Sequence, residues 1–331
     1  MYIKDSSEMT TYRDDMCTTS YSADIECVKK VQFSLMSPQE IKMRSVVEIT
    51  RSQLYDGGNT PCAGGLFDTK MGGGDTICTT DQLDKNISPG YFGNIELAIP
   101  VFYVQFMDWV KRVLQMICFR CGNILVDKEG VHAKQIRAIK LMENGSARFQ
   151  AMQKLIKSDS CKTCRACDAR QPTKYNYVKE DLQVFAVWVL TEKKSAPPPQ
   201  EDQPSKVLIT PDYALMLFRR LSDEDCSLLG FHPKYSRPEW MICTVLPVCP
   251  PCVRPSVKQD GNQRQEDDLT HKLVDITKCN EMLKSKMNVT GDKNVKMIES
   301  WRYILQYHIA TFIDNECGLN PDQKSTGSCL L

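Results

Sequence analysis

CFRCG (Cys118–Gly122) and CRAC (Cys164–Cys167) are the two stretches that decide how the middle of this chain folds. In each, two residues separate two cysteines, so that a tight turn brings both thiolates to one side. Gly122 relieves the backbone after the first pair. Two such pairs complete a tetrahedral shell of four sulfurs and leave no open position for water. The sequence therefore predicts one structural Zn²⁺, bound by Cys118, Cys121, Cys164 and Cys167.

Other cysteines leave alternatives open. Cys161 precedes Cys164 by one CxxC step and is an alternative third ligand. CPPC (Cys249–Cys252) is a second candidate for a metal or redox site, although it has no partner pair nearby and its two prolines favour an extended chain. The simplest alternative for every cysteine is a buried free thiol.

Composition restricts the class of protein. The chain has 331 residues, 16 cysteines, 42 Lys+Arg and 41 Asp+Glu, with a formal net charge of +1. This is typical of a soluble globular protein with two or three subdomains. The most apolar stretch, residues 95–110, is interrupted by charged residues and is shorter than the ~18 apolar residues of a membrane span. The charged N-terminus does not resemble a signal peptide, so we expect an intracellular protein.

Charge is unevenly distributed along the chain. Residues 1–26 are rich in acids, Ser and Thr without an apolar period, which predicts a mobile acidic tail. Residues 128–174 carry eleven Lys and Arg against four acids. This basic stretch is either a solvated helix face or a patch that faces phosphate. Because the total charge is near zero, any binding to nucleic acid must come from such a local patch.

Two helical runs near the end of the chain predict an antiparallel hairpin. Their apolar residues recur at alternating four- and three-residue steps, the seam of a coiled coil, and a short loop with Thr290-Gly291 joins them. The seam positions are Leu269, Leu273, Ile276, Asn280, Leu283 and Met287, then Ile298, Trp301, Leu305, His308 and Phe312. On this seam His308 is expected to be a core histidine and not a ligand.

Familiar catalytic patterns are absent from the sequence. It has no phosphate loop with Gly-Lys-Ser/Thr, no HExxH and no Gly-x-Ser-x-Gly, and it holds only four histidines. The residues alone therefore predict a zinc-stabilised binding or assembly module.

Several ordered stretches resemble the largest subunit of multisubunit DNA-directed RNA polymerases, most of all the eukaryotic polymerase II type. They follow the family's order and spacing from about residue 27 to about residue 325. The stretches are VQFSLMSPQEIKMRSVVEIT (31–50), GGLFDTKMG (64–72), PGYFGNIELAIPVF (89–102), CFRCGNILVD (118–127), LGFHPKYSRPEWMICTVLPV (229–248), VRPSV (253–257), EDDLTHKLVDI (266–276) and LQYHIATFIDN (305–315).

The resemblance implies an α+β fold, a polymerase clamp made of several parts. These are an acidic tail (1–26), the first part of the clamp core (27–110), a clamp head with the zinc site (111–236), a return to the clamp core with the lid loop (237–268), the clamp coiled-coil hairpin (269–317) and a truncated rudder region (318–331).

The resemblance also implies roles for particular residues. The four cysteines predicted from spacing coincide with the family's clamp-head zinc ligands. The lid, residues 254–268, would help to separate RNA from the template. Nucleic-acid contacts are implied at Arg254, Lys258, Arg264 and Lys324, and docking of initiation and elongation factors on the hairpin at Asn280, Lys284 and Lys286. The implied partners are the other polymerase subunits, template DNA and nascent RNA.

One departure from the family concerns a second zinc site. Just before its counterpart of residues 89–102, the family has the pattern C-x2-C-x6-C-x2-H. Here these places are Cys78, Asp81, Ser88 and Tyr91, so a single ligand survives. We expect this metal to be lost, which leaves one zinc per chain and is typical of a divergent lineage such as a large DNA virus.

The other departure is at the end of the chain. The family continues to the aspartates that bind the catalytic Mg²⁺, whereas this sequence ends at SCLL. The resemblance then implies a clamp fragment of a nucleotidyltransferase that works in trans with a separate chain carrying the Mg²⁺. The alternatives are a free-standing clamp mimic that binds transcription factors and a truncated gene product. The expected location is the nucleus or, for a viral protein, a cytoplasmic factory or the virion.

Overall fold

The computed structural model describes residues 31, 33–57, 60–73, 77–84, 87–159, 163–178, 182–188, 206–258, 264–288 and 295–316. Its contacts divide the chain into Met1–Leu35 and Met36–Leu331. In the first unit, residue 31 and residues 33–35 form neither helix nor strand, and Phe33 is exposed. The predicted acidic tail lies outside the described residues. No helix in the described ranges is long and apolar enough to cross a membrane.

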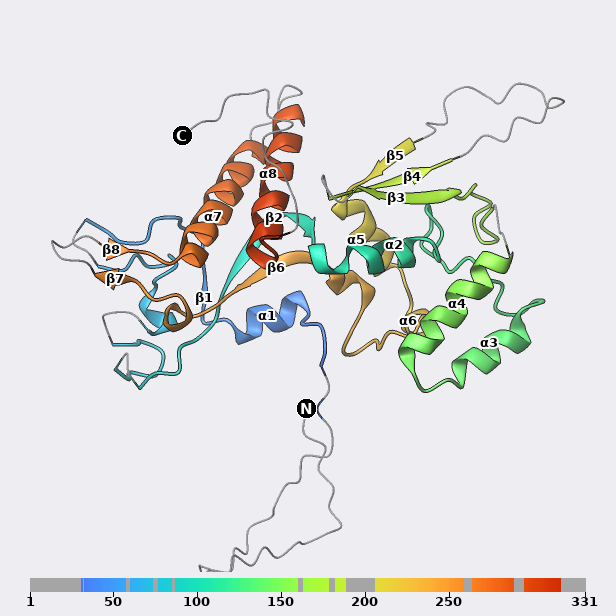
Figure 1. Ribbon diagram of the computed structural model, residues 1–331, viewed down its shortest axis with the longest axis horizontal. Helices are drawn as coiled ribbons and strands as arrows, with labels where there is room; N and C mark the ends of the chain where they lie inside the picture. The colour runs from blue at the N-terminus through green and yellow to red at the C-terminus, as the bar shows by residue number, and fades with distance from the viewer. Residues whose placement is uncertain are drawn as a thin grey trace, which may run out of the picture. The chain divides into compact units, whose positions relative to one another are not determined.

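Helices and strands are mixed along the second unit, which confirms the predicted α+β class (Figure 1). The α-helices are α1 (Pro38–Arg44), α2 (Met107–Leu114), α3 (Ala133–Lys140), α4 (Gly145–Asp159), α5 (Pro211–Arg219), α6 (Asp223–Leu228), α7 (Asp268–Met287) and α8 (Val295–Ile313). The strands are β1 (Val47–Glu48), β2 (Gly93–Phe102), β3 (Lys174–Val178), β4 (Gln183–Val187), β5 (Lys206–Ile209), β6 (Ile242–Val248), β7 (Val257–Lys258) and β8 (Arg264–Gln265). Short 3₁₀ turns are η1 (Thr69–Met71), η2 (Val104–Phe106), η3 (Pro238–Met241) and η4 (Pro251–Val253).

A three-stranded sheet carries the core nearest the hairpin. Its order is β1-β2-β6, with β1 parallel and β6 antiparallel to β2. The β2 side chains Ile95, Ile99 and Val101 are buried against apolar residues of β6, α7 and α8. The register between β2 and β6 shifts between Glu96 and Val101. Pro100 lies within this irregular segment, where its missing N–H is tolerated.

Helices α7 and α8 pack against each other and against β2 (Figure 1). The predicted seam is largely confirmed, since Leu273, Ile276, Leu283 and Leu305 are fully buried. Its ends differ: Leu269 and Met287 are exposed. On α8 the buried set extends to Ile309 and Ala310, because this helix packs on both α7 and the sheet and buries more than a coiled-coil stripe. The predicted Thr290-Gly291 loop lies outside the described residues.

The short strand β1 pairs with only the start of one edge of β2. Farther along that edge, two side-chain amides of the hairpin bind the backbone of β2. Asn280 accepts from the Ala98 N–H at 2.7 Å and donates to the Glu96 carbonyl at 2.9 Å. Gln306 accepts from the Phe102 N–H and donates to the Phe102 carbonyl, both at 2.7 Å. These amides take the place of a further strand, because they form hydrogen bonds with backbone groups of β2 that an adjacent strand would otherwise bind.

The middle of the chain forms a second sheet and a group of helices. Strands β3, β4 and β5 are consecutive and antiparallel. Helices α3, α4 and α6 contact one another. Trp109 of α2 lies 4.9 Å from Phe149 of α4, and Phe149 lies 5.8 Å from Phe231, measured between ring centroids. This aromatic group links α2 and α4, the helices that precede the two cysteine turns along the chain.

Candidate functional site

The four predicted cysteines meet in one place. The Sγ atoms of Cys118, Cys121, Cys164 and Cys167 all lie within 4.8 Å of one another, and all four cysteines are free thiols. The closest pairs, Cys118 with Cys167 and Cys121 with Cys164, are both 3.6 Å apart. Four sulfurs at the usual Zn–S distance in a tetrahedron are roughly 3.8 Å apart, so the group fits Zn²⁺. No position of this shell is left for a substrate, which fits a structural metal.

Both cysteine turns have the same backbone geometry. The Cys118 N–H donates to the Asn123 carbonyl, and the Gly122 N–H donates to the Cys118 carbonyl. The second turn repeats these bonds between Cys164 and Ala169 and from Asp168 to Cys164. Gly122 has φ +82° and Asp168 has φ +53°, so each turn needs a left-handed residue directly after its second cysteine.

Gln171 orients the cluster from outside the four sulfurs. Its amide nitrogen donates to Cys118 Sγ at 3.2 Å and to the Ala169 carbonyl at 2.7 Å, and its Oε1 accepts from the Phe119 N–H at 2.8 Å. Side chains of this kind fix the orientation of metal ligands. Sequence reasoning missed Gln171, since its only local signal is a polar residue that follows the second turn.

The two thiols of the first turn differ in acidity. Burial raises the pKa of Cys118, but hydrogen bonds to its sulfur from the N–H groups of Cys121 and Arg120 and from the thiols of Cys121 and Cys164 together lower the pKa to about 7. Burial raises the pKa of Cys121 to about 12. Zn²⁺ binds thiolates, so it must displace protons here, and its affinity falls as the pH is lowered.

A third turn of the same form lies where the resemblance implies a second metal site. The Cys78 N–H donates to the Leu83 carbonyl, the Gln82 N–H donates to the Cys78 carbonyl, and Gln82 has φ +56°. Asp81 takes the place of the second cysteine. Its Oδ2 accepts from Ser88 Oγ at 2.7 Å and its Oδ1 accepts from the Leu83 N–H at 3.0 Å. The hydrogen bond from Ser88 lowers the pKa of Asp81.

The structure gives no support to the two other candidate cysteine ligands or sites, Cys161 and the CPPC stretch (Cys249–Cys252). Within the described ranges, the only group of three or more metal-binding side chains is the four-cysteine cluster. Cys252 is exposed, and its Sγ lies 3.8 Å from the Pro89 carbonyl. Cys161 lies outside the described residues.

Arg254, which the resemblance places at a nucleic-acid contact, lies in the core instead. Its side chain is 0% exposed, so it does not face nucleic acid. The guanidinium donates to the Leu66 carbonyl, to the Cys249 carbonyl at 3.1 Å and to Thr270 Oγ1 at 3.4 Å. A guanidinium carries five N–H groups, and here they join three segments of the core.

Of the other three predicted nucleic-acid contacts, two lie within the described residues. Lys258 ends β7 and pairs with Arg264 at the start of β8. Arg264 is half-buried, lies over the ring of Tyr55 and donates to the Tyr55 hydroxyl at 3.0 Å. Lys324 lies outside the described residues.

The predicted docking residues of the hairpin separate into two kinds. Asn280 is 4% exposed and is bound to β2, so it is not available to a partner. Lys284 is exposed and Lys286 is half-exposed, both in the last turn of α7. Only the two lysines remain as predicted docking residues.

Comparison with known proteins gives a consistent result. The family model described as RNA polymerase Rpb1, domain 1, matches residues 25–329. The chain belongs to this family. It is 36% identical over 305 residues to a protein named DNA-directed RNA polymerase II subunit RPB1 from Euplotoides octocarinatus, and the match covers 90% of this chain and 61% of the relative. The chain thus spans about three-fifths of the length of the curated relative that it matches.

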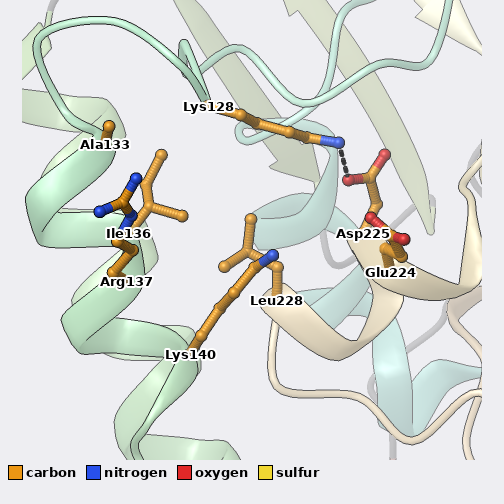
Figure 2. A pocket seen from close by; sticks show the side chains of 8 residues that line it. All are labelled: Lys128, Ala133, Ile136, Arg137, Lys140, Glu224, Asp225 and Leu228. Carbon is orange, nitrogen blue, oxygen red and sulfur yellow. Dashed lines mark ion pairs between the residues drawn. The ribbon is translucent and has the colours of Figure 1, made fainter.

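In this family member, the basic stretch 128–174 is partly neutralised within the fold. Arg165 pairs with Asp127 at 2.8 Å, and Lys128 pairs with Asp225. Figure 2 shows the latter pair at the edge of a small cavity of about 130 Å³ between α3 and α6. The described residues provide no ion pair for the exposed cations of α3, which are Lys134, Arg137 and Lys140. Helix α3 therefore presents three exposed cations that have no ion pair within the described residues.

Proposed function

We propose that this chain forms the clamp of the largest subunit of a DNA-directed RNA polymerase. The observation that carries the proposal is the family match over residues 25–329, which includes the four-cysteine cluster, the β7–β8 ribbon and the α7–α8 hairpin. Each of these parts has a role in the proposal. The zinc cluster fixes two distant segments of the head, residues 118–121 and 164–167, relative to each other.

The nucleic-acid roles follow from charge and position. Lys258 and Arg264 would place positive charge on the β7–β8 ribbon, which helps to separate RNA from the template, and the α3 cations would grip DNA or the hybrid through phosphates. Lys284 and Lys286 would meet initiation and elongation factors at the end of α7. Lys324 is proposed as a further phosphate contact.

Nucleotide addition requires carboxylates that bind two Mg²⁺ ions and stabilise the attacking and leaving oxygens. In this proposal sequence outside these 331 residues supplies those carboxylates, in trans if a separate chain carries them. The partners are the remaining polymerase subunits, DNA and RNA, and the location is the nucleus.

Copurification tests the proposal. The chain is tagged and isolated from its own cells, and the bound proteins are identified by mass spectrometry. We expect the other polymerase subunits, together with sequence that carries the active centre. A tagged chain that is folded and zinc-loaded but brings down no polymerase subunit would contradict the proposal.

A further inference from the structure

A series of ring contacts connects the β7–β8 ribbon with the core. The guanidinium carbon of Arg264 lies 4.6 Å from the centroid of the Tyr55 ring. Tyr55 stacks on Phe67, with centroids 5.4 Å apart and an angle of 16° between the planes. The guanidinium carbon of Arg254 lies 5.1 Å from the Phe67 centroid. We call these four residues, Arg264, Tyr55, Phe67 and Arg254, the stack.

One end of the stack is fixed. Arg254 is fully buried and bound to Leu66, Cys249 and Thr270, so it is tied to the core and to the first turn of α7. Phe67 is 5% exposed. These two side chains form an immobile base against which Tyr55 can pack.

The other end of the stack lies on an element that needs support. Strands β7 and β8 have two residues each and, among the described strands, pair only with each other. An isolated two-stranded ribbon is marginally stable at best in water. Ser256 donates to Glu266 at 3.0 Å, which closes the stem of the ribbon. The contact of Arg264 with Tyr55 joins the ribbon to a different part of the chain.

We infer that Tyr55 and Phe67 are positioning residues that hold the β7–β8 ribbon against the core, so that the ribbon stands in a fixed place beside nucleic acid. The consequence for RNA rests on the proposed clamp function, whereas the contact itself does not. Aromatic pairs and cation–π contacts each add to the stability of such an arrangement beyond the burial of area.

Trypsin cleavage after Arg264, followed by mass spectrometry on the full chain within its purified complex, tests the contact. The side chain of Arg264 must leave Tyr55 to enter the protease. Tyr55→Leu should raise the rate of cleavage about tenfold, and Phe67→Leu should also raise it, because both remove ring contacts. Tyr55→Phe keeps the ring but loses the hydroxyl that accepts a hydrogen bond from Arg264, so it should raise the rate less than Tyr55→Leu does. Phe185→Leu is the matched control, since it removes a ring beneath Lys206 in the β3–β4–β5 sheet, and should leave the rate unchanged.

The same complexes are then tested for RNA displacement by measuring the length of the RNA–DNA hybrid. Tyr55→Leu should lengthen the hybrid, Tyr55→Phe should lengthen it less, and Phe185→Leu should leave it unchanged. Unchanged cleavage in both Tyr55→Leu and Phe67→Leu would overturn the stack as an anchor. Faster cleavage with an unchanged hybrid would overturn its role beside RNA. Failure of the proposed function itself is recognised separately, because the wild-type chain would then yield no polymerase complex.

Discussion

Replacement of Gln306 by leucine tests how the hairpin is joined to the sheet. Gln306 is 6% exposed, and its amide makes two hydrogen bonds of 2.7 Å to the backbone of Phe102, which is itself 2% exposed. Leucine is close to glutamine in volume but cannot form hydrogen bonds. Gln306→Leu therefore leaves a buried N–H and a buried carbonyl without partners.

The expected loss follows from those two groups. Each buried backbone group left unsatisfied costs about 1–3 kcal/mol, so Gln306→Leu should lower the free energy of unfolding by about 2–6 kcal/mol. The total free energy of unfolding of a typical domain is only about 5–15 kcal/mol, so the effect is large. The exposed Gln150 of α4 provides the matched control, and Gln150→Leu should change stability by less than about 0.5 kcal/mol.

Urea unfolding, monitored by tryptophan fluorescence, measures both variants, and Trp301 lies in α8 near the changed residue. The contrary result is that Gln306→Leu unfolds at the same urea concentration as the wild type and Gln150→Leu. Equal stability would mean that the amide of Gln306 does not complete the edge of β2.

Further predictions concern the metal sites and the response to pH. Metal analysis should find one Zn²⁺ per chain; Cys121→Ser should lose it and Cys252→Ser should retain it, whereas two or none in the wild type would contradict the assignment. The combined change Asp81→Cys, Ser88→Cys and Tyr91→His should raise the zinc content to two per chain, because the turn at Cys78 already has the required backbone geometry. A content of one Zn²⁺ per chain would show that the rest of that site has diverged. Burial lowers the pKa of His308 below its ordinary 6.5, so the unfolded chain binds the proton more readily and stability should fall as the pH drops below about 6.5. His308→Phe should make the unfolding midpoint depend less on pH between about pH 7 and pH 5, and an unaltered dependence would contradict the assignment of the effect to His308.

The parts that the sequence predicted well are those that local patterns determine. CxxC spacing brings two sulfurs together within one turn, so Cys118, Cys121, Cys164 and Cys167 were identified without a structure. The heptad pattern likewise found α7 and α8, because a repeating apolar stripe must be buried against a partner.

The parts that it missed depend on distant contacts. Asn280 bonds to β2 residues more than 180 positions away, and on a coiled-coil seam an asparagine is expected to face its partner helix. Arg254 was expected to contact nucleic acid because the resemblance places it at the start of the lid. Its burial depends on two backbone carbonyls and a threonine that the fold brings around it, and no spacing along the chain reveals them.

RNA synthesis by material purified through a tag on this chain tests the central claim most directly. The tagged chain is isolated under mild conditions and supplied with template DNA, nucleotides and Mg²⁺. We expect DNA-dependent RNA synthesis that copurifies with the chain, and none from the same 331 residues purified alone from a foreign host. A folded, zinc-loaded chain whose isolates never contain polymerase activity would contradict the claim that it is a polymerase clamp.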